Sequence, residues 1–158
     1  MNAKALELQE RTQKFAAHVI KFCEGLPNDT VCRQIVEQLT DSAGATDSNY
    51  RAACRARSPG EFIAKIGVAA EEADETQGWL ELLVRTSFTS AESARALIQE
   101  ADELTAIFVA SRKTAKRRQE LRQRLVRQQA SGRNSTRRST RTRNRVNLAS
   151  PREAMSKR

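Results

Sequence analysis

The segment that begins at Ser58 constrains the fold more than any other part of the chain. Ser58 can accept a hydrogen bond from a first-turn amide, and Pro59 suits the first helical position. Glu61 is placed to reach back to the backbone N–H of Ser58. Apolar or small residues then recur at alternating steps of four and three, at positions 62, 66, 69, 73, 76, 80 and 83. This spacing predicts a long helix that packs one face against other helices.

Three further stretches show the same spacing. They cover residues 8–26, 32–56 and 94–115. Asn28 is the expected N-cap of the second helix, and Thr89 with Glu92 forms the expected capping box of the fourth. Gly44 is expected at a close helix crossing or a local bend, because a mid-helix glycine costs about 1 kcal/mol against alanine. With no strand-like alternation, the sequence predicts an all-α fold, an antiparallel four-helix bundle.

Cysteine usage and hydropathy favour a cytoplasmic protein. The three cysteines, Cys23, Cys32 and Cys54, include no C-x-x-C pair, so neither a zinc site nor a redox motif is indicated. Buried free thiols in a reducing compartment are expected. No apolar run approaches the length of a membrane span, and the N-terminal residues carry a charge every few positions. No membrane association is expected.

Charge divides the chain into two parts. Residues 111–158 hold 17 of the 28 Lys and Arg and two of the 19 acids, a net charge of +15. The remaining 11 bases and 17 acids leave residues 1–110 at −6. We therefore expect a four-helix bundle over residues 1–130, with the last helix extended by a basic segment from residue 112. Residues 131–158 are expected to form a disordered Arg-rich tail, because they hold too few apolar residues to fold alone.

The basic segment is the candidate nucleic-acid site. Guanidinium groups bind phosphate through two hydrogen bonds, and the interspersed hydroxyls add donors. Because residues 111–158 contain no aromatic side chain, phosphate contact without sequence reading is expected. The alternatives are a solvated tail and a tail that binds the acidic body of its own oligomer. The candidate residues are Arg112, Lys113, Lys116, Arg117, Arg118, Arg122, Arg124, Arg127, Arg133, Arg137, Arg138, Arg141, Arg143 and Arg145.

Enzyme chemistry finds no support in the sequence. His18 is the only histidine, so the Glu-x-x-His pairs of a di-iron bundle are absent. Four acids lie together between residues 71 and 75, but without an imidazole they are expected to be a solvated helix face. No phosphate-binding loop or nucleophile elbow occurs. We expect no catalytic residue, no metal site and no cofactor.

One family resemblance runs through the first two-thirds of the chain. The run SNYRAA at residues 48–53 resembles a motif of the four-helix bundle proteins encoded in intervening sequences of bacterial 23S ribosomal RNA genes. Ala52 and Glu71 depart from the Glu and Lys that the family usually has there. Weaker similarity extends from about residue 15 to residue 108. The further matched positions are Ser58, Glu61, Phe62, Ile63, Lys65, Glu72, Ala73, Glu75, Thr76, Trp79 and Leu80.

The resemblance implies self-assembly and two kinds of partner. The family is similar to accessory proteins of diversity-generating retroelements, which form pentameric barrels and are associated with a reverse transcriptase and its RNA. A homopentamer that binds RNA is therefore expected. The alternative is a protein–protein adaptor or accessory subunit, for example of a reverse transcriptase, with the bundle surface as the working site. The residues expected in oligomer contacts or core packing are Asn49, Tyr50, Phe62, Trp79 and Leu80.

Overall fold

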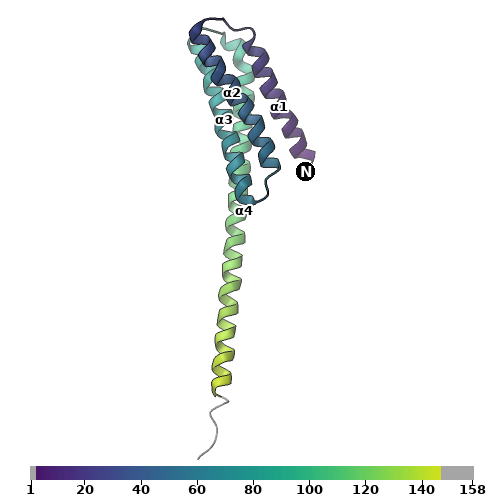
Figure 1. Ribbon diagram of the computed structural model, residues 1–158, viewed down its shortest axis with the longest axis vertical. Coiled ribbons are helices and arrows are strands. Elements are labelled where there is room, and N and C mark those ends of the chain that lie inside the picture. Colours follow the sequence, from purple (N-terminus) through teal and green to yellow (C-terminus); the bar gives the residue numbers. More distant parts are fainter. Residues whose placement is uncertain (1–2, 147–158) are drawn as a thin grey trace, which may run out of the picture. The chain divides into compact units, whose positions relative to one another are not determined.

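The fold consists of helices throughout the described chain. The computed structural model describes the backbone of residues 3–146 and the side chains of residues 3–129. Within this part the helices are α1 (Ala3–Cys23), α2 (Thr30–Cys54), α3 (Pro59–Arg85) and α4 (Ala91–Val146), and no strand occurs (Figure 1). The predicted all-α four-helix bundle is confirmed.

Two compact units divide the chain, residues 1–117 and residues 118–158. The first unit, called the bundle below, holds α1, α2, α3 and the first part of α4. The predicted helical extension into the basic segment is present, because α4 continues through residue 127 to Val146. The backbone of residues 131–146 thus belongs to α4, whereas residues 147–158 lie outside the described residues. An isolated helix rich in Ser and Thr is only marginally stable in water, so the disorder of the tail stays a prediction.

The caps of α2 and α4 each lie one residue after the predicted position. The carboxylate of Asp29 accepts hydrogen bonds from the amides of Val31 and Cys32, at 2.8 and 3.1 Å. Asn28 is therefore not the cap, because the side chain of the next residue is the one that reaches the free amides. At the start of α4, Ser90 Oγ accepts from the amide of Ser93 at 3.1 Å. This residue, rather than the predicted Thr89, occupies the capping position.

The cap of α3 is the one the sequence predicts. Ser58 has an extended backbone, and its Oγ accepts a hydrogen bond from the amide of Glu61 at 3.1 Å. The carboxylate of Glu61 reaches back one residue further than expected and accepts from the amide of Arg57 at 2.8 Å. The reciprocal bonds still satisfy two backbone donors, which fixes the turn between α2 and α3.

The core follows the predicted apolar stripes. Six of the seven stripe positions of α3 are buried, and the seventh, Phe62, is partly buried against the core. The buried hydroxyl groups are all hydrogen-bonded: Ser42 and Thr76 bond to each other at 2.9 Å, and Thr12 bonds to Asp47 at 2.8 Å. Thr46 donates to the carbonyl oxygen of Ser42. Gly44 is exposed with no atom within 4 Å of an added Cβ, so it does not mark a close helix crossing.

Contacts between residues of different helices establish which helices are neighbours. α2 packs against both α1 and α3. Arg11 on α1 pairs with Glu100 on α4, and Arg112 on α4 lies against Gly67 on α3. Across the core, the ring of Tyr50 stacks on that of Phe108 with centroids 5.4 Å apart. No helix in the described part of the chain is long and apolar enough to cross a membrane.

The five residues expected in oligomer contacts or core packing differ in their burial. Tyr50 and Leu80 belong to the core, and Phe62 and Trp79 are partly buried against it. Trp79 Nε1 donates a hydrogen bond to Glu75 at 3.0 Å, and Asn49 Nδ2 donates to the carbonyl oxygen of Ala45 at 3.0 Å. The half-buried Asn49 thus satisfies its amide within its own helix.

Candidate nucleic-acid interface

The predicted nucleic-acid residues fall into three groups. In the bundle, Arg112, Lys113, Lys116 and Arg117 lie on α4. In the second unit, Arg118, Arg122, Arg124 and Arg127 lie on the continuation of the same helix. The side chains of the third group lie outside the described residues; they are Arg133, Arg137, Arg138, Arg141, Arg143 and Arg145.

Arg112 differs from its neighbours because it packs into the bundle. An added Cβ at Gly67 would lie 2.8 Å from Cζ of Arg112, so the absence of a side chain makes room for the guanidinium group. Arg112 Nη1 lies 3.8 Å from a carboxylate oxygen of Glu71, and Arg112 Nε is buried without a hydrogen-bond partner among the described residues. Arg112 therefore stabilises the contact between α3 and α4 and is less accessible to a ligand than its exposed neighbours.

The remaining basic residues of the first two groups are exposed. Lys113, Lys116 and Arg117 of the bundle are exposed, as are the four arginines of the second unit. Within residues 112–129, Glu120 is the only acid. None of these seven exposed side chains forms an ion pair with another described residue. The segment therefore presents cations that are not already neutralised, which suits a polyanion.

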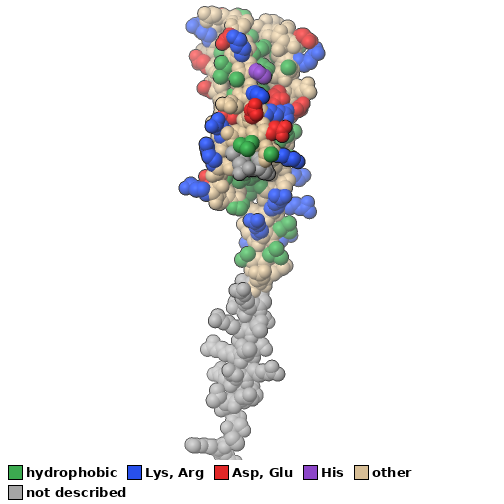
Figure 2. Space-filling model, turned by 90° about the vertical axis from the view of Figure 1, so that its right-hand side faces the viewer, with side chains coloured by type: hydrophobic (Ala, Val, Ile, Leu, Met, Phe, Trp, Pro, Cys, Tyr) green, Lys and Arg blue, Asp and Glu red, His purple; other side chains and the backbone are tan. Residues whose placement is uncertain are grey.

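Some acidic side chains of the bundle lie among basic ones, and others lie close to one another on α3. Figure 2 shows acidic and basic side chains mixed over the visible face of the bundle. On α3, burial raises the pKa of Glu72, and the nearby carboxylates of Glu75 and Glu71 raise it further. In the part of the chain that the structure describes, no three His, Cys, Asp or Glu side chains come together in a geometry for a metal ion.

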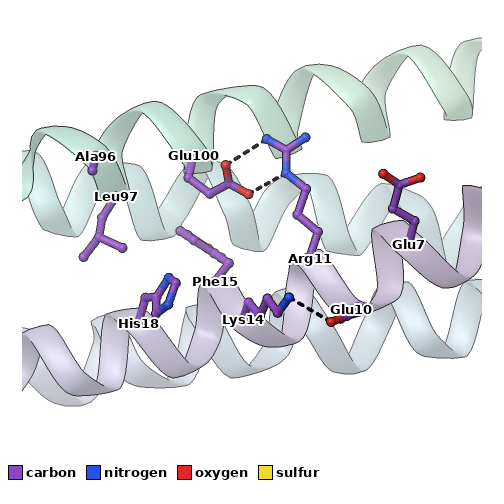
Figure 3. A pocket seen from close by; sticks show the side chains of 9 residues that line it. All are labelled: Glu7, Glu10, Arg11, Lys14, Phe15, His18, Ala96, Leu97 and Glu100. Carbon is purple, nitrogen blue, oxygen red and sulfur yellow. Dashed lines mark hydrogen bonds and ion pairs between the residues drawn. The ribbon is translucent and has the colours of Figure 1, made fainter.

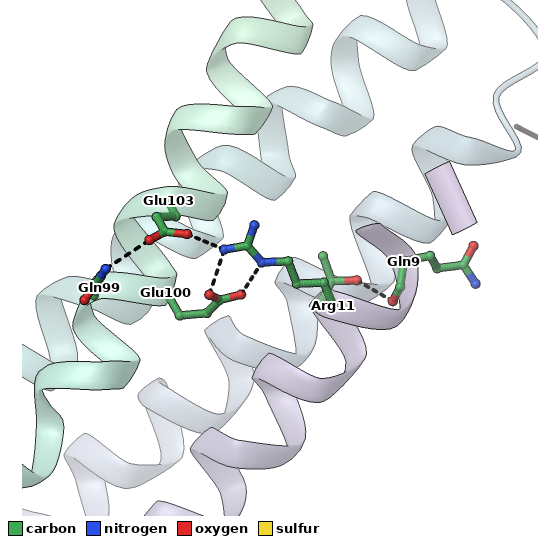
Figure 4. Close-up of polar contacts among 6 residues, drawn as sticks. Gln9, Arg11, Gln99, Glu100 and Glu103 are labelled. Atoms are coloured by element: carbon green, nitrogen blue, oxygen red, sulfur yellow. Dashed lines mark hydrogen bonds and ion pairs between the residues drawn. The ribbon is translucent and has the colours of Figure 1, made fainter. Parts of the chain in front are cut away.

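A cavity of about 490 Å³ lies between α1 and α4, and both of its basic side chains, Arg11 and Lys14, are paired with carboxylates (Figure 3). Arg11 forms two hydrogen bonds with Glu100, at 2.6 and 2.8 Å, and a third with Glu103 at 2.5 Å (Figure 4). Lys14 pairs with Glu10 at 2.8 Å and lowers the pKa of that carboxyl. This cavity therefore offers no unpaired arginine or lysine to an anionic ligand.

The sequence did not reveal a second cavity, of about 760 Å³, at the end of the bundle where α2 ends and α3 begins. All four helices contribute to its walls, including Tyr50, Phe62 and Ile107. Tyr50 and Phe62 were predicted in oligomer contacts or core packing, not in the wall of a cavity. No local pattern could have placed them beside Ile107, which lies far away in the sequence.

Comparison with known proteins relates the bundle, but not the basic segment, to a family. Residues 4–110 match the family of 23S rRNA-intervening sequence proteins. A similar solved structure is that of a protein of unknown function from the S23 ribosomal protein family of Bacteroides thetaiotaomicron. It is 27% identical, aligns with a TM-score of 0.64, and the match covers 70% of this chain and 98% of that one. A comparison with curated proteins finds no match.

Proposed function

The chain belongs to the family of 23S rRNA-intervening sequence proteins, and we propose that it is a non-enzymatic, oligomeric helical bundle that binds nucleic acid. The binding segment is the basic part of α4 from Lys113 onward, and RNA is the expected ligand before DNA. One observation carries the proposal: between residues 113 and 127 the chain has seven exposed cations and a single acid, Glu120. The family match ends at residue 110, so the proposed binding segment lies outside the region that this chain shares with the family.

The chemistry of the segment favours phosphate contacts over base reading. Arginine pairs with phosphate through two parallel hydrogen bonds, and lysine adds a compact charge. The described part of the segment contains no aromatic residue on which a base could stack. Affinity should therefore come from the release of counterions, with little dependence on base sequence.

Fluorescence anisotropy with unrelated RNA and DNA single strands, at several salt concentrations, tests the proposal. Engagement of about six phosphates predicts a slope of log K against log salt near −4. Replacing Arg118, Arg122, Arg124 and Arg127 with Gln should make the slope shallower by about two to three. The matched control replaces four exposed bundle cations, Lys21, Arg33, Arg85 and Arg95, with Gln. Both variants lose the same charge, so an equal effect of the two would contradict a dedicated segment.

Assembly into a homopentamer is the second part of the proposal. It is supported by the family to which the bundle belongs and by the partly buried Trp79, whose ring is not fully covered within one chain. Several basic segments on one assembly would act at high effective concentration and strengthen binding to one strand. Light scattering at micromolar concentration should give the mass of five chains, and a monomer mass would contradict this part.

An adaptor role, with a reverse transcriptase as one partner, is favoured by exposed apolar side chains on α4 beyond the bundle rather than on the bundle surface. Leu121, Leu125 and Val126 are 50, 57 and 65% exposed. Large apolar side chains at such exposure suit contact with a protein partner. If this role holds, nuclease-treated extracts should yield reverse-transcriptase activity bound to the chain, and Leu121→Gln with Leu125→Gln should abolish that recovery. Loss of recovery on nuclease treatment alone would favour the nucleic-acid role.

A further inference from the structure

The second cavity, of about 760 Å³ where α2 ends and α3 begins, is an open groove with an apolar floor that includes aromatic side chains. It is called the groove below. Its floor includes Phe62, Ile66 and Ile107, which come from two helices that are neighbours in the bundle. Tyr50 lies beside them, with its ring fixed against Phe108 at an interplanar angle of 23°. The hydroxyl of Tyr50 donates to the carbonyl oxygen of Ala5 at 3.4 Å, and burial raises its pKa, so it remains protonated at neutral pH. The groove is therefore a preformed apolar surface, and the partly buried aromatic side chain of Phe62 is part of its lining.

The rim of the groove is positively charged. Lys4 and Arg57 are its only charged lining residues within the part of the chain that the structure describes. The Arg57 side chain is 90% exposed, and its Nε lies 3.5 Å from Glu61, a distance too long for a strong hydrogen bond. Lys4 is exposed and forms no ion pair with another described residue. An anionic group of a ligand in the groove can therefore contact Lys4 directly, and it can contact the exposed guanidinium of Arg57 beside its ion pair with Glu61.

This end of the bundle is basic although residues 1–110 as a whole are acidic. Between residues 48 and 70 the chain carries four bases, Arg51, Arg55, Arg57 and Lys65, and one acid, Glu61. The stretch of α4 that reaches this end, from residue 104 to residue 117, carries four bases and no acid. The start of α1, residues 3–10, adds one base, Lys4, and two acids, Glu7 and Glu10. Bases still outnumber acids in these three stretches, which favours a partner with repeated negative charge.

We propose that the groove binds an unpaired base of a single-stranded nucleic acid, with Lys4 and Arg57 contacting the adjacent phosphates. The inference rests on the proposed nucleic-acid binding and specifies the form of the ligand. A base can stack on an aromatic face only when it is free of a duplex, and such stacking tolerates any base. The groove supplies the aromatic surface that the basic segment lacks. Stacking of a base in the groove would make the protein bind single strands more tightly than duplexes, a preference that phosphate contacts alone would not produce.

Binding of one oligonucleotide carrying 2-aminopurine, as a single strand and as a duplex, tests the inference. The emission of 2-aminopurine reports stacking, and anisotropy of a second label reports affinity. The full-length protein should bind the single strand more tightly than the duplex and change the emission. Phe62→Leu should weaken single-strand binding about fivefold or more, because one stacked base is lost, and should leave duplex binding unchanged.

A charge variant complements Phe62→Leu in case the loss of the ring perturbs folding. Lys4→Gln with Arg57→Gln changes only exposed side chains and should reduce the preference for single strands. The control, Lys21→Gln with Arg33→Gln, removes the same charge from exposed positions outside the groove and should leave the preference intact. Circular dichroism melting verifies that each variant folds.

Three outcomes would overturn the inference. If the chain binds nucleic acid with salt dependence but the groove variants bind both forms like the unchanged protein, the basic segment acts alone. If no form binds at low salt, the proposed function fails together with the groove. If Phe62→Leu instead abolishes binding of a labelled acidic amphipathic peptide or a fluorescent fatty acid, and nucleic-acid binding persists, the groove serves that ligand.

Discussion

The guanidinium group of Arg112 fills the space beside Gly67, where a Cβ atom would lie 2.8 Å from Cζ and 2.9 Å from Nε. The contact joins α4 to α3 at the position where the charge of the chain changes from acidic to basic. Glu71, one turn along α3, lies 3.8 Å from the same guanidinium. Arg112 thus begins the basic segment in the sequence but belongs to the bundle in space.

At an open helical position, replacing Gly with Ala raises the free energy of unfolding. For Gly67→Ala, we expect the change in this free energy to be about 1 kcal/mol less favourable. Alanine gains helix propensity, but its Cβ displaces the guanidinium of Arg112 and removes that contact. In an Arg112→Ala background, Gly67→Ala should recover the full gain. Urea denaturation of the four proteins gives the coupling free energy, and additive effects would contradict the contact.

Gly44→Ala is the matched open position and should stabilise the protein by about 0.5–1 kcal/mol. Gly44 lies inside α2, it is exposed, and an added Cβ meets no atom within 4 Å. Alanine therefore reduces the conformational entropy lost on folding without a steric cost. Thermal melting checks the result; a fall in the melting temperature would show that Gly44 is needed for a bend.

Acid should weaken the ion pairs between α1 and α4. Arg11 lowers the pKa of Glu103, and hydrogen bonding from Gln99 lowers it further. A carboxyl whose pKa is lower in the folded state stabilises the fold above its ordinary value of 4.5, and this contribution disappears as the pH falls through the lowered pKa. The free energy of unfolding should therefore decline below about pH 4.5.

The variant Arg11→Gln tests the assignment of this pH dependence. It should lower the stability at pH 7 and make the decline in acid less steep, because Glu103 then loses its largest interaction. Arg33→Gln, which removes an exposed charge that forms no ion pair with another described residue, is the control at the same charge change. An unchanged acid profile in Arg11→Gln would assign the decline to other carboxyl groups.

Limited trypsin digestion should separate the bundle from the tail. We expect the Arg-rich tail after residue 131 to be cut first, leaving a resistant fragment that ends between Arg112 and Arg133. Cleavage after Arg112 should be slow, because its side chain is held against Gly67. Mass spectrometry of the fragments provides the measurement. Rapid cleavage within residues 30–80, or full protection of the tail, would contradict the prediction.

Local features of the fold were predictable because they depend on residues close in the sequence. The spacing from Phe62 to Leu83 gave the buried face of α3, and Ser58 gave its cap. The caps of α2 and α4 were predicted one residue early, because Asn28 and Thr89 each precede a second residue of the same capping class. Side-chain geometry, which the sequence does not contain, decides between such neighbours.

Of the two candidate sites, the sequence predicted the basic segment but not the groove, because the groove depends on contacts between residues far apart in the sequence. The basic segment is a run of charges that any reading of the chain finds. The groove is not, because Lys4, Arg57 and Ile107 come from three separate parts of the sequence. Tyr50 and Phe62 were predicted in oligomer contacts or core packing. That they also line an open surface depends on where α1 begins relative to the end of α2.

By itself, the sequence determined that the chain forms helices with one apolar face each, and that its positive charge gathers after residue 111. Periodicity and net charge are properties of the chain alone, so no knowledge of neighbours was needed. Only the tertiary structure decided that Arg112 packs against Gly67 and that Arg11 joins α1 to α4. It also decided which side chains meet in the groove. Such contacts depend on the rotation and pairing of whole helices, which are set by the packing of residues far apart in the sequence.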